Sequence, residues 1–321
     1  MSWDKILGQA FATRVLQAHL ADERVAHAYL LAGPDGTGKR LVALEMAKAL
    51  NCTAPGSHPC DVCPTCVQIG RGTHPDVHVL SPVGSSDAIR IEAVRQLLGR
   101  IALRPFNAAF QAAIIDGAER LTEEAANSLL KALEEPPAHT RFLLTTSNPS
   151  DCLPTIVSRC QLVRCQPLPP ETIARILIEQ HACASDAART IAALAAGSAS
   201  QALALAGRWK VREEVVARLA SPRPSVWLEQ PLPETRQDVA DLLEEMIAWL
   251  RDLAIAATEA QGVVHAAHAE TLRHQAQAID LDRCLEAALE LVSLRESLGQ
   301  FVSPRMVASL ARETWLSLSD E

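Results

Sequence analysis

Short apolar runs alternate with segments of helical spacing along the first half of the chain. The runs have the length of strands and are bounded by turn residues: AHAYLLAG (26–33), PDVHVLSP (75–82), FQAAIID (110–116) and TRFLLTTSN (140–148). Apolar residues recur at helical intervals in a lead-in segment and between the runs, at 1–25, 41–51, 91–103 and 121–137. Because this alternation is typical of parallel strands, we predict an α/β fold whose mostly parallel sheet has helices on both faces.

The pattern changes at QPLPP (166–170), and no later segment has the character of a strand. Helical spacing continues in short segments and then in long amphipathic ones: 171–181, about 186–196, 198–206, 239–253 and 281–292. The last helix is predicted to start at Pro304, because proline is favoured at the first helical position. The prediction is an α/β domain, a small three-helix domain and an all-α domain, with bounds 1–166, 167–207 and 208–321.

Composition narrows the classes of protein to which the chain can belong. Hydrophobic residues make up 48% of it, but there is no run of 18 uncharged apolar residues and no secretory signal at the start. We therefore predict a cytoplasmic protein with no membrane contact. The net charge of −8 argues against a stand-alone DNA binder, although it leaves room for a local basic patch.

The first apolar run leads into a glycine-rich loop, GPDGTGKR (33–40), which fits G-x-x-x-x-G-K-[ST] at all but the last position. Gly33, Gly36 and Gly38 let backbone N–H groups face phosphate oxygens, and Lys39 can reach the outer phosphates. Arg40 stands where a magnesium-binding hydroxyl is expected, and a guanidinium has no acceptor for a metal. The loop therefore predicts either weak binding of ATP or ADP without hydrolysis, or a turn that binds nothing.

A second part of this predicted site follows the third apolar run, in QAAIIDGAERL (111–121). Asp116 ends the run, which is the usual position of the acid that holds magnesium through water. ATPases of this build have a glutamate next, which activates the attacking water, but here that residue is Gly117. Glu119, two residues further on, is not expected to replace it. Because one positioned base contributes roughly 10²–10⁴-fold to a rate, we predict that the chain's own site does not hydrolyse ATP.

Four cysteines lie close together in the sequence, at Cys52, Cys60, Cys63 and Cys66. Short C-x-x-C steps let thiolates reach one ion, and four thiolates complete a tetrahedral structural zinc site with no open position for catalysis. A disulfide fits poorly in a reducing compartment, and a redox C-x-x-C pair would leave two of the cysteines unused. We therefore predict structural Zn²⁺ in an insertion at about 52–66, with His58 as a rival ligand.

The segment LTEEAANSLLKALEEPPAHTRFLLTTSNPSDCLPTIVSRC (121–160) resembles the clamp-loader family of AAA+ ATPases. The combination of LLKALEEPP, TTSNP and LPTIVSRC carries the resemblance, and the cysteine insertion after the phosphate-loop helix resembles the bacterial DNA polymerase III branch, delta-prime type. The resemblance covers the first two domains well and the C-terminal helices weakly. It implies an AAA+ P-loop domain, a helical lid and an all-α collar that serves oligomerisation.

The resemblance also implies roles for individual residues. Arg159 falls in the S-R-C motif, whose arginine acts in trans on the ATP of a neighbouring subunit as an arginine finger. From spacing alone, Arg159 could equally be a surface ion-pair residue. Ser147 lies at the first sensor position, as part of a degenerate nucleotide site. The second sensor arginine is expected after a Gly-Ser pair in the lid, and Ser200 occupies that position.

The resemblance implies a non-hydrolysing member of a hetero-pentameric ring that also contains gamma/tau and delta subunits. Such a ring loads the sliding clamp onto primed DNA during replication. DNA-directed DNA polymerase (nucleotidyltransferase) activity would belong to the chain only through membership in the holoenzyme, with no intrinsic ATPase or polymerase activity. Two alternatives are an ATP-hydrolysing gamma/tau-type subunit, disfavoured by residues 40, 117 and 200, and a zinc-dependent DNA-binding module, disfavoured by the net charge.

Overall fold

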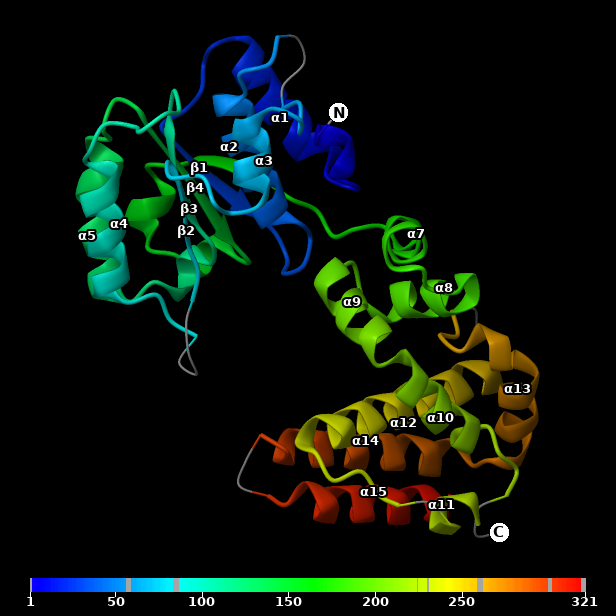
Figure 1. The fold of residues 1–321 in the computed structure, drawn as a ribbon. Helices are drawn as coiled ribbons and strands as arrows, with labels where there is room; N and C mark the ends of the chain where they lie inside the picture. The colour runs from blue at the N-terminus through cyan, green and yellow to red at the C-terminus, as the bar shows by residue number, and fades with distance from the viewer. Residues whose placement is uncertain are drawn as a thin grey trace. The chain divides into compact units, whose positions relative to one another are not determined.

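The computed structural model describes residues 2–55, 59–82, 87–223, 225–229, 231–258, 262–299 and 302–318. The chain forms two compact units, which are treated separately below (Figure 1). The first unit contains Met1–Ile176 and Ala195–Gln201, and the second contains Leu177–Leu194 and Ala202–Glu321. The three-domain division proposed from the sequence stays a prediction.

A five-stranded parallel sheet forms the centre of the first unit, with strand order β2-β3-β4-β1-β5. The strands are β1 (Ala28–Ala32), β2 (Val77–Leu80), β3 (Gln111–Ile115), β4 (Thr140–Thr146) and β5 (Gln161–Arg164). The predicted α/β class and the four predicted strands are confirmed. The sequence analysis missed β5, because this four-residue edge strand exposes both of its polar ends and lacks a continuous apolar run.

Helices cover both faces of this sheet, as the alternation predicted. The helical segments are η1 (Ser2–Lys5), α1 (Ala10–Ala21), α2 (Lys39–Asn51), α3 (Pro64–Gly70), α4 (Ile91–Ile101), η2 (Ala118–Arg120), α5 (Glu123–Glu134), η3 (Pro149–Asp151) and α6 (Pro154–Val157). Figure 1 shows α1, α2 and α3 on one side of the sheet and α4 and α5 on the other.

Alternate residues of the buried strands supply two separate hydrophobic cores, because successive side chains of a strand point to opposite faces. Tyr29 and Leu31 pack into the core that includes α1 and α2. Leu30 packs into the other core, with residues of α4 and α5. Thr122 caps α5, because its hydroxyl accepts a hydrogen bond from the backbone N–H of Ala125. This cap fixes where the chain turns back after β3.

The second unit is helical throughout its described part. Its elements are α8 (Ser185–Leu194), α10 (Trp209–Leu219), α11 (Val226–Glu229), α12 (Arg236–Ala257), η4 (Ala266–His268), α13 (Ala269–Ala278), α14 (Leu281–Ser297) and α15 (Pro304–Ser317), while α7 (Pro170–His181) and α9 (Ala199–Gly207) have residues in both units. The predicted start of the last helix at Pro304 is confirmed. Helix α12 is central, since α10, α13, α14 and α15 all contact it. Among the described helices, none is long and apolar enough to cross a membrane.

A buried ionic network joins α12 to the segment that precedes α13. His265 contacts two carboxylates: its Nδ1 lies 2.8 Å from Asp252 Oδ2, and its Nε2 lies 2.7 Å from Glu245 Oε1. Asp252 also accepts backbone N–H bonds from Val264 and His265, and Arg212 pairs with Glu245. Burial alone would lower the pKa of His265, but the two carboxylates outweigh it and raise that pKa above its usual value. The imidazole is therefore held in its charged form.

We predict that His265→Gln destabilises the helical unit by about 3 kcal/mol, because it leaves two buried carboxylates without their shared cation. Urea unfolding followed by tryptophan fluorescence measures this, since four of the five tryptophans lie in the second unit. His268→Gln is the matched control. His268 also packs against Trp249, with ring centroids 5.6 Å apart, but no carboxylate contacts it in the described part of the chain.

The same variant gives a test by pH. Because the folded-state pKa of His265 is raised, its contribution to stability is complete below about pH 6.5 and is lost as pH rises through the folded pKa. The difference in unfolding free energy between the unmodified chain and His265→Gln should therefore shrink from pH 6 to pH 9. A difference that grows over this range would contradict a charged His265.

Candidate functional site

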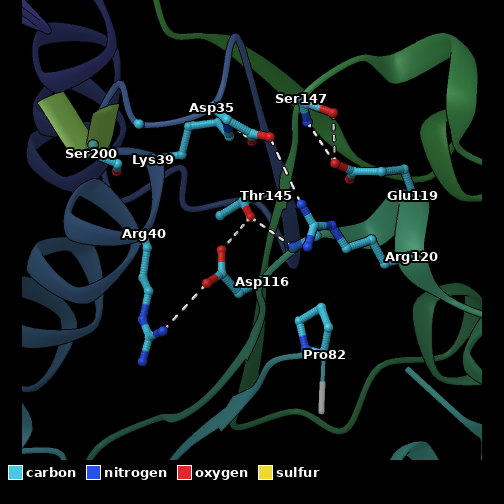
Figure 2. Close-up of a pocket in the computed structure, with 13 residues that line it drawn as sticks. Asp35, Lys39, Arg40, Pro82, Asp116, Glu119, Arg120, Thr145, Ser147 and Ser200 are labelled. Carbon is cyan, nitrogen blue, oxygen red and sulfur yellow. Dashed lines mark hydrogen bonds and ion pairs between the residues drawn. The ribbon is translucent and has the colours of Figure 1, made fainter. Parts of the chain in front are cut away.

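The carboxyl ends of β1, β3 and β4 meet around a cavity of about 420 Å³ (Figure 2). Residues of the glycine-rich loop line one wall, and residues that follow β3 and β4 line another. The lining includes Gly36, Gly38, Lys39, Arg40, Asp116, Glu119, Ser147 and Ser200. Parallel α/β sheets bind ligands at this edge, so the cavity is the candidate nucleotide pocket.

Two glycines of the glycine-rich loop, Gly33 and Gly36, are packed so closely that they cannot carry side chains. A Cβ on Gly33 would lie 2.1 Å from the carbonyl oxygen of Cys165, at the end of β5. Gly36 has a φ of +75°, and a Cβ there would lie 2.0 Å from Ser198 Oγ. Lys39 begins α2 and is only 7% exposed, with its Nζ 2.6 Å from the carbonyl oxygen of Gly33. The loop thus has the strand–loop–helix setting that the motif requires, and its lysine is held by the loop's own carbonyls.

Arg40 points toward Asp116, as Figure 2 shows, with Nη1 3.4 Å from Asp116 Oδ2. The other carboxylate oxygen of Asp116 accepts a 2.8 Å hydrogen bond from Thr145 Oγ1, and the backbone N–H of Gly117 donates to the same hydroxyl. Both oxygens of Asp116 therefore have partners within the protein. The carboxylate that would orient a hydrated magnesium ion faces a fixed cation instead.

Glu119 also lines the cavity, but its carboxylate holds the end of β4. Its Oε1 accepts hydrogen bonds from the hydroxyl of Ser147 at 2.7 Å and from the backbone N–H of Ser147 at 3.0 Å. Burial raises the pKa of Glu119, but the hydrogen bonds from Ser147 outweigh it, and the pKa lies below its ordinary value. A weakly basic, already engaged carboxylate is a poor activator of water. Glu119 Oε1 is thus engaged in holding Ser147.

The lid segment closes over the loop without an arginine. The backbone N–H of Ala199 donates to the carbonyl oxygen of Gly36 at 2.9 Å, and Ser200 lines the cavity. The position of the expected second sensor therefore does lie at the pocket, but its side chain is a short neutral hydroxyl. No charge reaches a bound phosphate from this position.

Several residues that line or support the pocket were missed by the sequence analysis. Buried Gln9 donates to the carbonyl oxygens of Thr37 and Gln166 and so joins the loop to the chain that leaves β5. Arg120 lines the cavity and pairs with Asp35 of the loop. These polar residues belong to no short motif, and only their pairing across more than 25 positions of sequence reveals them. Thr145 is a further such residue.

The four cysteines predicted to bind a metal do come together. The sulfurs of Cys52, Cys60, Cys63 and Cys66 all lie within 4.8 Å of one another. The backbone N–H of Cys63 donates to Cys60 Sγ, and that of Cys66 donates to Cys63 Sγ. The rival ligand His58 lies outside the described residues. Four converging sulfurs with N–H donors fit a metal ion, because such donors stabilise thiolates.

The sulfurs differ in how readily they lose a proton. Burial raises the pKa of Cys63, but the backbone N–H groups of Cys66 and Thr53 outweigh it and bring the pKa to about 6. Burial raises the pKa of Cys66 to about 12. An ion at this centre would have to displace the proton of Cys66, whereas Cys63 is already largely ionised at neutral pH.

Ion pairs fasten the cysteine segment to α2. Lys48 is buried, and its Nζ lies 2.8 Å from Asp61 Oδ1 and 2.6 Å from Glu45 Oε1. Lys5 pairs with the other oxygen of Asp61 at 2.5 Å. Asp61 lies within the C-x-x-C step, so these pairs fix the cysteine loop relative to the helix that follows the phosphate loop.

Arg159 lies after α6 and is not among the residues that line the described pocket. Its Nη2 is 2.5 Å from Glu134 Oε1, and its Nη1 donates to the carbonyl oxygen of Thr155 at 3.0 Å. Both members of the Glu134 pair are partly exposed, so the pair contributes little to stability and is easily exchanged for another partner.

The family model described as "DNA polymerase III, delta subunit" matches residues 8–169. DNA polymerase III subunit delta' of Pseudomonas aeruginosa is 39% identical over 226 residues, which cover 65% of this chain and 67% of that protein. The chain belongs to the delta-prime family of bacterial DNA polymerase III clamp-loader subunits.

Two further relatives define how far this similarity extends. Subunit delta' of Bacillus subtilis is 40% identical over 168 residues, 52% of this chain and 50% of that protein. The tau subunit of B. subtilis is 37% identical over 160 residues, which cover 50% of this chain and 28% of that protein. This chain thus matches about half the length of the B. subtilis delta' protein. Its AAA+ architecture is carried by the parallel sheet and the phosphate loop at the carboxyl ends of its strands.

Proposed function

We propose that the chain is a non-hydrolysing subunit of a clamp loader that supplies Arg159 in trans to the nucleotide of a neighbouring subunit. The observation that carries the first half is the Arg40–Asp116 pair in a pocket that also lacks a water-activating base. The second half is supported by the position of Arg159, which is absent from the lining of its own pocket and bound by a single exchangeable carboxylate. A guanidinium suits this role because it is always charged and binds phosphate oxygens in pairs.

The partners that we propose are gamma/tau and delta subunits in a hetero-pentameric ring in the cytoplasm. Through that ring the chain would help to load a sliding clamp onto primed DNA, and only through it would the chain share in DNA-directed DNA polymerase activity. Similarity to both delta' and tau proteins supports membership in such an assembly. In this proposal the predicted AAA+ domain carries Arg159. The predicted lid follows it, and the predicted collar forms the contacts of the ring.

The alternative is an ATP-hydrolysing subunit of the gamma/tau type. Similarity to a tau subunit is the observation that supports it. Three positions count against it: Arg40 in place of a hydroxyl, Gly117 in place of glutamate, and Ser200 in place of arginine. Each position lines the cavity, so each departure removes a group from the reaction centre rather than from a remote surface. The geometry favours the non-hydrolysing reading.

Arg159→Ala should abolish hydrolysis at one site of the reconstituted ring while ring assembly persists. The physical reason is the loss of a cation worth on the order of 10³-fold in rate at that site. Steady-state ATP turnover and light scattering coupled to size exclusion measure the two effects. The purified chain alone should show negligible turnover before and after the change.

Glu134→Ala tests whether Arg159 acts only through its ion pair, because this variant removes the other partner of that pair. If Arg159 acts only through Glu134, both variants should lose activity equally. If Arg159 acts on a neighbour's nucleotide, Glu134→Ala should retain full turnover. Wild-type turnover in Arg159→Ala would refute the proposed trans role.

Nucleotide binding by the isolated chain should not require magnesium, because Arg40 already neutralises Asp116 where a metal would lie. Titration with a fluorescent ATP analogue should give similar affinities in EDTA and in magnesium. Arg40→Ser restores a hydroxyl and frees Asp116, so magnesium should then tighten binding on the order of tenfold, which is about 1.4 kcal/mol. Arg14→Ser, an exposed arginine of α1, is the control. Binding by the unmodified chain that needs magnesium would contradict this role of Arg40.

We propose that the four-cysteine centre holds one structural Zn²⁺, with Cys52, Cys60, Cys63 and Cys66 as ligands. Metal analysis of the purified chain should give one zinc per chain, and Cys60→Ser with Cys63→Ser should remove it. Because a zinc centre contributes directly to folding, the double variant should also lower the melting temperature of the first unit. Cys183→Ser, a cysteine outside the cluster, is the control and should keep the metal. A chain that retains stoichiometric zinc in the double variant would show that other residues bind it.

A further inference from the structure

A second cavity of the first unit lies at the opposite edge of the sheet from the phosphate loop. It is open, has a volume of about 680 Å³ and lies where β2 and β3 begin and α4 ends. Residues 72–78 form one side, and the segment that follows α4 forms the other. No residue of the nucleotide pocket lines this cavity, so the two sites are separate.

Two almost fully buried side chains that carry unpaired polar atoms line this cavity. His74 and Gln111 are each 3% exposed and both line it. Nδ1 of His74 accepts a hydrogen bond from the backbone N–H of Asp76, whereas His74 Nε2 and Gln111 Oε1 have no partner among the described residues. Burial lowers the pKa of His74, more than the Asp76 carboxylate and the nearby Asn107 side chain raise it. The ring is therefore neutral with its proton on Nε2, so one buried donor and one buried acceptor lack partners.

Two cations and two apolar side chains stand at the mouth of the same cavity. Arg100 and Arg104 line it, and in the described part of the chain neither guanidinium has a hydrogen bond or an ion pair. Leu103 is 71% exposed and Phe106 is 82% exposed. An aromatic ring this open on a protein surface leaves its faces free for stacking.

The segment that carries Phe106 is held in place by a buried carboxylate. Asp76 accepts backbone N–H bonds from Phe106, Asn107 and Ala108 at 2.7–3.0 Å. Burial raises the pKa of Asp76, but these three hydrogen bonds outweigh it and lower the pKa. These three bonds hold Asp76 in its ionised form and fix the segment that carries Phe106. The cavity is thus preorganised and cationic within a chain that is acidic as a whole.

We propose that this cavity is a binding site for single-stranded nucleic acid. Phe106 stacks on one base, Arg100 and Arg104 contact the adjacent phosphates, and the Nε2–H of His74 and the Oε1 of Gln111 bond the edge of a base. A base edge offers an acceptor beside a donor, which is the complement of these two atoms. An aromatic ring next to arginines in a groove is the usual combination for single strands.

An acidic peptide is the competing occupant, since it too would satisfy the two arginines. It would leave a planar ring exposed on a rigid segment without a matching flat partner, so the observations favour a nucleobase. Because the chain as a whole has a net charge of −8, we expect nucleic acid to bind only at this cavity and to bind more weakly as the salt concentration rises. We expect a Kd on the order of 10⁻⁵ M for a short single strand at low salt.

Fluorescence anisotropy of a fluorescein-labelled single-stranded DNA of about 12 nucleotides tests the site with the full chain. Phe106→Ala should weaken binding about tenfold, through lost stacking. Arg100→Ala with Arg104→Ala should lower the slope of log K against log salt by about 1.4, the value for two phosphate contacts on a single strand. The controls are Phe11→Ala, an exposed aromatic of α1, and Arg95→Ala, an exposed arginine of α4 outside the cavity.

The controls should bind like the unmodified chain. Absence of binding at millimolar protein, or equal binding by all variants, would overturn the proposal. A poly-glutamate peptide provides the competing ligand. If the double arginine variant loses only the peptide and keeps the oligonucleotide, the occupant is an acidic peptide and the nucleic-acid assignment is wrong.

Discussion

The parallel pairing of β1 between β4 and β5 is the constraint on which the candidate pocket depends. Because these strands run in one direction and in register, the phosphate loop after β1 and Ser147 after β4 emerge at the same edge. The pairing with β5 also brings the carbonyl oxygen of Cys165 against Gly33, where only glycine fits. The loop is thereby fixed from both sides before any ligand arrives. The same pairing explains why the loop keeps its form although its chemistry has changed.

Charge compensation inside the pocket follows a different logic from that of a metal-dependent ATPase. A phosphate-loop enzyme imports its positive charge with each magnesium nucleotide, whereas here Arg40 and Arg120 are built into the walls. Arg40 pairs with Asp116, and Arg120 pairs with Asp35 and Asp87, so both cations already have partners within the protein. Such a pocket loses the adjustable cation that follows charge as it moves during phosphoryl transfer. Its electrostatic environment is set by side chains of the pocket itself.

Much of this architecture could be predicted from the sequence, and the misses have physical causes. The three inner strands, β1, β3 and β4, were readable because both faces of each are covered, which produces continuous apolar runs. The edge strand β2 was readable from its short apolar run between turn residues. Strand β5 was missed because it is a short edge strand with polar ends. The cysteine cluster was predictable because its four members lie close together in the sequence. The Arg40–Asp116 pair joins residues 76 positions apart, and Gln9 contacts Gln166 across 157, so only the fold reveals them. The unpaired atoms of His74 and Gln111 likewise could not be predicted from the sequence, because they too depend on the fold.

The unequal acidity of the cysteine sulfurs has a consequence for handling the protein. A thiol with a pKa of about 6, such as Cys63, is mostly a nucleophilic thiolate at neutral pH, and thiolates are the species that oxidants attack. Neighbouring sulfurs are within easy reach, since Cys60 and Cys66 lie 4.0 Å apart. If a chelator removes the proposed metal ion in air, two cysteines of the cluster can therefore form a disulfide. Such a disulfide would prevent a metal ion from binding again. If the cluster holds an ion, as proposed, coordination would keep these sulfurs from forming that disulfide.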